Sequence, residues 1–115
     1  MMKMDKCEFD LKFENNCAIL AVSGRINGMT SKSFEDKIKE IFDSGNKFEK
    51  IIFDFKNVEY ISSSGLRIIL YTRKRLYSLF NDKEDYASRV VVKNVSDDIR
   101  EIFDMTGFDT IVDLE

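Results

Sequence analysis

The pattern that most constrains the fold is the strict alternation of apolar and charged residues over 7–14. The apolar positions are Cys7, Phe9, Leu11 and Phe13. A period of two predicts a strand with one buried face. The pair Asn15 and Asn16 is typical of a tight turn, and an apolar run at 18–22 follows it and ends at Ser23 and Gly24. We therefore expect an antiparallel β-hairpin at the start of the fold.

Helix and strand alternate after the hairpin. Apolar residues at helical spacing predict an amphipathic helix over 30–44, with Ser31 as its N-cap and Gly45 just past its end. The apolar run 51–55 is typical of a central strand covered on its faces, and a turn is expected over 56–63. A second helix is predicted over 64–80, because apolar residues recur there near 3.6 spacing.

The remaining chain continues this alternation. A loop is predicted over the polar segment 81–88, and a strand over 89–93. Ser96 is a good N-cap for a short helix closed by Gly107, and a last strand is expected at 110–112. The order β-β-α-β-α-β-α-β in 115 residues predicts one α/β domain over 1–115. Its sheet should be mixed, mostly parallel and covered by helices.

Composition excludes several classes of function. The net charge is −3 and the basic residues are scattered among acids, so no basic stripe exists to bind nucleic acid directly. The longest apolar stretches fall far short of the roughly 20 residues that span a bilayer, and we expect no membrane partner. Residues 1–6 lack the apolar core of a secretory signal, which favours a cytoplasmic location.

The two cysteines should be free thiols. Cys17 is expected opposite Glu14 in the hairpin, which leaves Cys7 roughly 20 Å further along at about 3.3 Å per residue. A disulfide requires Cα atoms within about 7 Å. Two unpaired cysteines agree with a reducing compartment.

An enzyme built on a serine nucleophile is not expected, because the sequence contains no histidine. A Ser–Lys pair stays formally possible, with Lys56 as the nearby lysine. The sequence lacks a nucleophile elbow, a phosphate loop and a dinucleotide fingerprint. A metal site has little support, since Asp97 and Asp98 fit the first turn of a helix better than a ligand set. We predict no catalytic residues, no metal and no cofactor.

Three consecutive serines, Ser62, Ser63 and Ser64, precede Gly65 at the start of the predicted second helix. A helix N-terminus offers unpaired N–H groups and a partial positive charge, which would stabilise an added phosphate. At a binding surface the same phosphate would repel an acidic partner or disrupt a dry contact. The alternative is simple capping, because serine is a preferred N-cap.

The basic residues of the same helix allow two interpretations, a contact surface for an acidic partner or, more commonly, a solvated face. They are Arg67, Arg73, Lys74 and Arg75.

The residues around the serines match a known family motif in order and spacing. The motif reads strand, Asp, spacer, Val, spacer, then Asp-Ser-Ser-Gly-Leu or Ser-Ser-Ala-Gly-Leu. The matching residues are Asp54, Val58, Ile61, Ser62, Ser63, Gly65 and Leu66. Residues 102–108 are similar to a second family block, Leu-Phe-Asp-Met-Ser-Gly-Leu, and residues 23–27 resemble its Gly-x-Leu-Asp turn. Over nearly its whole length the chain resembles a single STAS domain of the bacterial anti-sigma factor antagonists, also called anti-anti-sigma factors.

This resemblance implies a function in signalling. A family member binds an anti-sigma factor that is also a serine kinase, and so releases a sigma factor to regulate transcription. Phosphorylation by the kinase ends the binding, and a PP2C-type phosphatase reverses it. Carried over to this sequence, the phosphoacceptor is Ser63. The residues expected at the partner interface are Asn27, Ser62, Ser64, Gly65, Leu66 and Arg67.

Two positions depart from the family pattern, since Ser62 and Asn27 stand where many members have Asp. Both changes remove a negative charge near Ser63. The segment 81–88 also lacks a glycine pair that is common in relatives. These departures leave an alternative open, a STAS scaffold or ligand-sensing module that is never phosphorylated.

Overall fold

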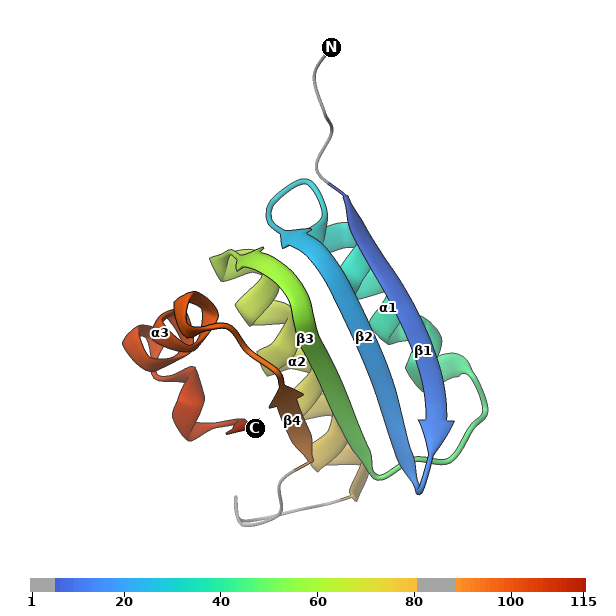
Figure 1. Cartoon of the computed structure of the whole chain (residues 1–115). Coiled ribbons are helices and arrows are strands. Elements are labelled where there is room, and N and C mark those ends of the chain that lie inside the picture. The colour runs from blue at the N-terminus through green and yellow to red at the C-terminus, as the bar shows by residue number, and fades with distance from the viewer. Residues whose placement is uncertain (1–5, 81–88) are drawn as a thin grey trace.

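The computed structural model describes residues 6–80 and 89–115, and its centre is one five-stranded sheet (Figure 1). The strands lie in chain order, and only the β1–β2 pair is antiparallel. The strands are β1 (Cys7–Glu14), β2 (Cys17–Ile26), β3 (Lys50–Ile61), β4 (Val90–Lys93) and β5 (Asp113–Leu114). The predicted single α/β domain with a mixed, mostly parallel sheet is confirmed. The loop expected at 81–88 lies outside the described residues.

The predicted N-terminal hairpin is confirmed, although β2 runs to Ile26, past the end expected at Ser23 and Gly24. Asn15 and Asn16 have φ of 52° and 61°, as the central residues of a tight hairpin turn require, and asparagine tolerates this left-handed region. The register places Glu14 opposite Cys17 and Cys7 opposite Gly24. Both cysteines are therefore free thiols, at opposite ends of the hairpin.

Two helices pack side by side on one face of the sheet. They are α1 (Ser31–Asp43) and α2 (Ser63–Phe80), and Figure 1 shows both behind the strands. The apolar core lies between the sheet and these two helices. There the ring centroid of Phe34 on α1 lies 6.2 Å from that of Phe9 and 5.7 Å from that of Phe53. Among the described residues, no helix is long and apolar enough to cross a bilayer.

On the opposite face of the sheet, residues 6–80 and 89–115 place no helix in front of β1, β2 and β3 (Figure 1). Burial alternates along β3, where Ile51, Phe53 and Phe55 are fully buried while Ile52 and Asp54 are only half-buried. The expectation that helices cover both faces of 51–55 was therefore wrong. We call this side of the sheet the open face.

The short third helix, α3 (Asp97–Thr106), lies beside β3 and β4. Its predicted caps are confirmed, because the Ser96 hydroxyl accepts a hydrogen bond from the Ile99 N–H at 3.2 Å and Gly107 ends the helix with φ 78°. The prediction of a last strand at 110–112 was wrong. Residues 108–110 form a 3-10 helix, η1 (Phe108–Thr110), and the pairing with β4 begins only at Asp113.

β3 is the element that sequence patterns described least well. It runs to Ile61, although a turn was expected over 56–63. The parallel pairing with β2 continues to the end of both strands through two register shifts, and each shift inserts an extra residue on β3. The buried positions after Phe55 are consequently three apart, at Val58 and Ile61, which breaks the period of two that identifies a strand. This extension carries the chain directly to the serines.

Candidate functional site

The serines lie at the carboxyl end of the parallel strands β2 and β3. The Ser62 N–H donates to the Ile26 carbonyl at 2.8 Å, which ties the two strand ends together. Asn27 begins the β2–α1 loop and Ser63 is the first residue of α2, so two sequence-distant segments meet at one edge of the sheet. The carboxyl ends of parallel strands are where α/β proteins commonly build their sites.

The three serines have different environments. Ser62 occupies the N-cap position, since its carbonyl accepts from the Leu66 N–H at 3.0 Å and its hydroxyl accepts a long bond from the Gly65 N–H at 3.4 Å. The hydroxyls of Ser62 and Ser64 also lie 2.7 Å apart, in one hydrogen bond between two half-buried side chains. Ser63 is exposed, and among the described residues nothing hydrogen-bonds its hydroxyl. Ser63 is thus the most accessible hydroxyl of the cluster.

The neighbouring β2–α1 loop is organised by Asn27 and Thr30. The Asn27 carboxamide oxygen accepts from the N–H groups of Met29 at 2.9 Å and Thr30 at 3.2 Å. The Thr30 hydroxyl donates to the Arg25 carbonyl at 2.6 Å and accepts from the Asn27 N–H at 2.9 Å. Thr30 is also the N-cap of α1, so the expectation of Ser31 was wrong by one residue. The closed network makes Asn27 a residue that shapes the loop.

Two of the residues expected at a partner interface are buried. Gly65 lies against β2 and β3, where a side chain at this position would clash with Ile26 and Ile61. Leu66 is 4% exposed and belongs to the core. The side chain of Leu66 therefore offers little surface to a partner, and the place of both residues at an interface stays a prediction. In this structure both position the start of α2.

The surface beside Ser63 is a groove between α1 and α2. Its volume is about 310 Å³, and it is lined by Ser31, Glu35, Ser64, Arg67, Ile68 and Tyr71. Arg67 is exposed at the groove, as expected of an interface residue. Sequence reasoning missed three exposed apolar or aromatic side chains near this edge, Met29, Tyr60 and Tyr71. The i, i+4 spacing of Arg67 and Tyr71 was the available signal, because it places both on one side of a helix.

The charge beside Ser63 is mixed. The N-terminus of α2 adds a partial positive charge and Arg67 a full one, whereas Glu35 on α1 also lines the groove. Asn27 and Ser62 are uncharged, so the adjacent loop and cap add no opposing negative charge. Within the described part of the chain, no cluster of three or more His, Cys, Asp or Glu side chains offers a metal site.

Comparisons with known proteins identify the family. The model of the STAS domain matches residues 8–115. BtrV of Bordetella bronchiseptica, a protein assigned by name as an anti-sigma factor antagonist, is 26% identical over 90 residues, which cover 78% of this chain and 70% of that protein.

Solved structures share the fold. An anti-sigma factor antagonist from Mycobacterium paratuberculosis matches with a TM-score of 0.73 at 20% identity, over 95% of this chain and 85% of that one. The Bacillus protein SpoIIAA in its unphosphorylated form matches with a TM-score of 0.72 at 19% identity, over 94% and 88% of the two chains. With the family model covering nearly every residue and the fold in agreement, this chain belongs to the STAS domain family.

Proposed function

We propose that this protein is an anti-sigma factor antagonist whose binding to an anti-sigma factor is controlled by phosphorylation of Ser63. Two findings support the proposal. BtrV and the Mycobacterium protein carry this function in their names, and SpoIIAA has been solved in both an unphosphorylated and a phosphorylated form. The chain itself acts as a binding protein of a non-enzymatic family, and the cytoplasmic location stays a prediction.

The observation that carries the proposal is the contrast among the three serine hydroxyls. Ser62 and Ser64 are bonded to each other at 2.7 Å, whereas Ser63 projects from the first turn of α2 into solvent. A kinase needs an accessible hydroxyl that can approach the γ-phosphate of ATP in line. In the transfer, the Ser63 oxygen bonds to that phosphorus, its proton is released, and ADP leaves.

The phosphate would affect both the start of α2 and the surface that binds the partner. At the start of α2 its charge of about −1.5 to −2 is stabilised by the free N–H groups and the helix dipole. At the protein surface the same charge adds bulk and negative potential next to the α1–α2 groove. The unphosphorylated form is then the one that binds the anti-sigma factor, a serine kinase in this proposal, and a PP2C-type phosphatase restores it.

The direct test is phosphorylation by the serine kinase encoded nearest to this gene, with ATP, followed by mass spectrometry. We expect one phosphate on Ser63 and none on the Ser63→Ala variant. Ser62→Ala and Ser64→Ala are the matched controls, and both should still be modified. Absence of phosphate at Ser63, with a kinase that is active on another substrate, contradicts the proposal.

The switch is tested separately by affinity. Ser63→Asp places a negative charge at the start of α2 and should weaken binding to the anti-sigma factor by about tenfold or more, measured by calorimetry. Ser63→Ala should bind as wild type does, because it removes only a hydroxyl. Equal affinities of the Asp and Ala variants would refute control by charge at this position.

A second candidate function is a STAS scaffold or ligand-sensing module that binds its partner constitutively. It is favoured by the uncharged residues Asn27 and Ser62, because phosphorylated relatives commonly carry Asp there. This function predicts that partner capture is the same with and without ATP and is unchanged by Ser63→Ala. Loss of capture in ATP for the wild type alone excludes it.

A further inference from the structure

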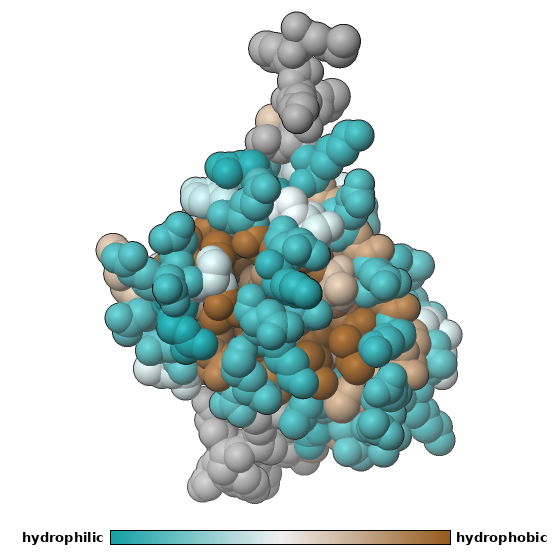
Figure 2. All heavy atoms as spheres, viewed as in Figure 1, coloured by the Kyte–Doolittle hydropathy of each residue, from teal (hydrophilic) through white to brown (hydrophobic). Residues whose placement is uncertain are grey.

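The open face of the sheet carries apolar side chains that the core does not use. Ile19 and Ile52 are half-buried neighbours on β2 and β3, and neither packs against the buried cluster between the sheet and the helices. Figure 2 views this side of the molecule and shows apolar side chains exposed between hydrophilic ones. An apolar strip in the middle of a polar face is typical of a contact surface.

The strand register arranges the open face in rungs that cross the sheet. One rung consists of Asp10, Ala21, Asp54 and Lys93, and the next of Lys12, Ile19, Ile52 and Val91. Each rung runs from β1 through β2 and β3 to β4. The exposed apolar strip therefore lies in the two central strands, because Val91 on β4 is only 2% exposed. Asp10 and Lys93 stand at the two ends of the first rung, and Lys12 stands at one end of the second.

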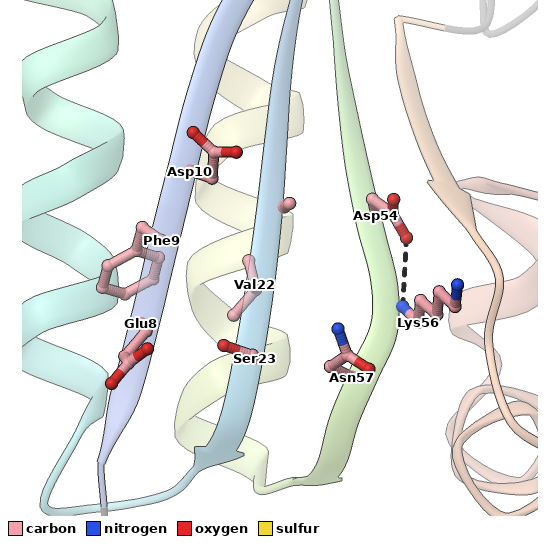
Figure 3. A pocket seen from close by; sticks show the side chains of 9 residues that line it. Glu8, Phe9, Asp10, Val22, Ser23, Asp54, Lys56 and Asn57 are labelled. Carbon is pink, nitrogen blue, oxygen red and sulfur yellow. Dashed lines mark hydrogen bonds between the residues drawn. The ribbon is translucent and has the colours of Figure 1, made fainter.

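The charges on the two sides have opposite sign. The β1 side carries Glu8, Asp10 and Glu14, with Lys12 as its single base. On the other side, β3 and β4 present Lys50, Lys56 and Lys93. Figure 3 shows the pocket between these sides, about 270 Å³ in volume, with Glu8 and Asp10 on β1 and Lys56 on β3, whereas Phe9 is turned toward α1.

Two acids lie on the basic side, Asp54 on β3 and Asp113 on β5, where Asp113 is paired with Val91. Asp54 is already engaged. The Asp54 carboxylate oxygen accepts from the Asn94 side-chain amide at 2.9 Å and from the Lys56 backbone N–H at 3.0 Å. Within the described residues, Lys93 forms no ion pair and Asp10 forms none either. The face thus presents acids on β1 and lysines on β3 and β4, and both sets include groups available to another molecule.

We propose that the open face binds the open face of a second copy of this chain. A two-fold axis parallel to the strands, between β2 and β3, exchanges the two sides of the face and keeps every rung at the same height. β1 of one copy then lies over β4 of the other, and β2 over β3. In this arrangement Asp10 meets Lys93 of the other copy, Ile19 meets Ile52, and symmetry makes each contact twice. An axis across the strands would instead place the acidic β1 over itself.

The size of the face indicates a weak dimer. Three strands of about eight residues and the four residues of β4, spaced by about 4.8 Å and rising about 3.3 Å per residue, give a face of ~450 Å² per copy. The total, ~900 Å², is in the range of weak and transient interfaces, so we expect a Kd on the order of 100 µM. The serine cluster lies at the end of the strands and stays accessible in such a dimer, so the inference is independent of the proposed function.

The test uses two variants that are complementary only in this geometry. Asp10→Lys gives like charges at both Asp10–Lys93 contacts, and Lys93→Asp does the same with the opposite sign. Sedimentation velocity over about 10–500 µM should detect the wild-type dimer, while each variant alone should dimerise at least about tenfold more weakly. A mixture of the two variants should restore association, because the mixed dimer regains both opposite-charge contacts.

Lys74→Asp is the matched control, since it makes the same charge change on the exposed side of α2 and should leave the dimer intact. Thermal unfolding of each variant shows that the fold is retained. A wild type that is monomeric at every concentration overturns the proposal. So does a mixture that fails to associate, or a Lys74→Asp variant that loses the dimer as Lys93→Asp does.

Discussion

Gly65 is a residue whose replacement tests how the start of α2 is positioned. A Cβ atom at this position would lie 2.7 Å from Cγ2 of Ile26 and 2.7 Å from Cγ1 of Ile61. Both isoleucines are at most 2% exposed, and the contacting atoms lie next to the branch point of each side chain. Neither can rotate away without displacing other core residues, so Gly65→Ala forces β3 and α2 apart.

The magnitude follows from two opposing effects. Forcing extra atoms into a dense core typically lowers the free energy of unfolding by about 1–3 kcal/mol. This is about the cost of removing one or two methylenes from the packing. Replacing a helical glycine by alanine recovers up to about 1 kcal/mol, and less in the first turn than in a helix interior. We therefore expect Gly65→Ala to lower the free energy of unfolding by about 1–2 kcal/mol.

Urea unfolding followed by circular dichroism measures this change. Gly28→Ala is the control, because a Cβ at Gly28 has no heavy atom within 4 Å and should leave stability nearly unchanged. If Gly65→Ala is as stable as the wild type while Gly28→Ala is neutral, the close approach of α2 to the strands does not constrain this position.

Three further changes test other parts of the structure. Thr30→Val removes a buried hydroxyl that both donates and accepts, and should destabilise by about 1–3 kcal/mol in urea unfolding, whereas Thr30→Ser should be milder. Ser96→Ala removes the N-cap bond of α3 and should cost about 1 kcal/mol, so unchanged stability would refute the cap's contribution. Burial raises the pKa of the Cys7 thiol to about 11 from 9.0. At pH 9, in a Cys17→Ser background, Cys7 should react with iodoacetamide about tenfold or more slowly than a cysteine peptide, and an equal rate would contradict its burial. The Cys7 thiol ionises at a lower pH in the unfolded chain than in the folded one. The contribution of Cys7 to the free energy of unfolding is therefore full below pH 9.0 and is lost as the pH rises through about 11.

Local patterns were sufficient where neighbouring residues define the structure. The hairpin was predicted because residues 7–14 alternate strictly and Asn15 and Asn16 tolerate positive φ. The caps of α3 were predicted because Ser96 and Gly107 act on the turn next to them. Resemblance in three separated segments predicted the STAS family, which the family model over residues 8–115 confirms.

Local patterns failed where the structure depends on pairing between segments that are far apart in the chain. β3 continues past residue 55 because β2 continues beside it, and the register shifts between them hide the alternation. Burial of Gly65 and Leu66 was likewise missed, since the motif that carries the resemblance does not say which of its residues face inward. The open face was missed because an apolar strand buried on both faces and one buried on a single face differ little over five residues.

The sequence alone determined that three serines stand at a helix start and that their surroundings resemble an anti-sigma factor antagonist. Their different environments were decided by tertiary structure. The bond from the Ser62 N–H to Ile26 and the fit of Gly65 against the strands orient the first turn of α2. In that orientation Ser62 and Ser64 pair with each other and Ser63 faces solvent. The accessibility of the Ser63 hydroxyl depends on how the fold orients the first turn of α2. The residues that orient this turn lie on β2 and β3, two strands far apart in the chain.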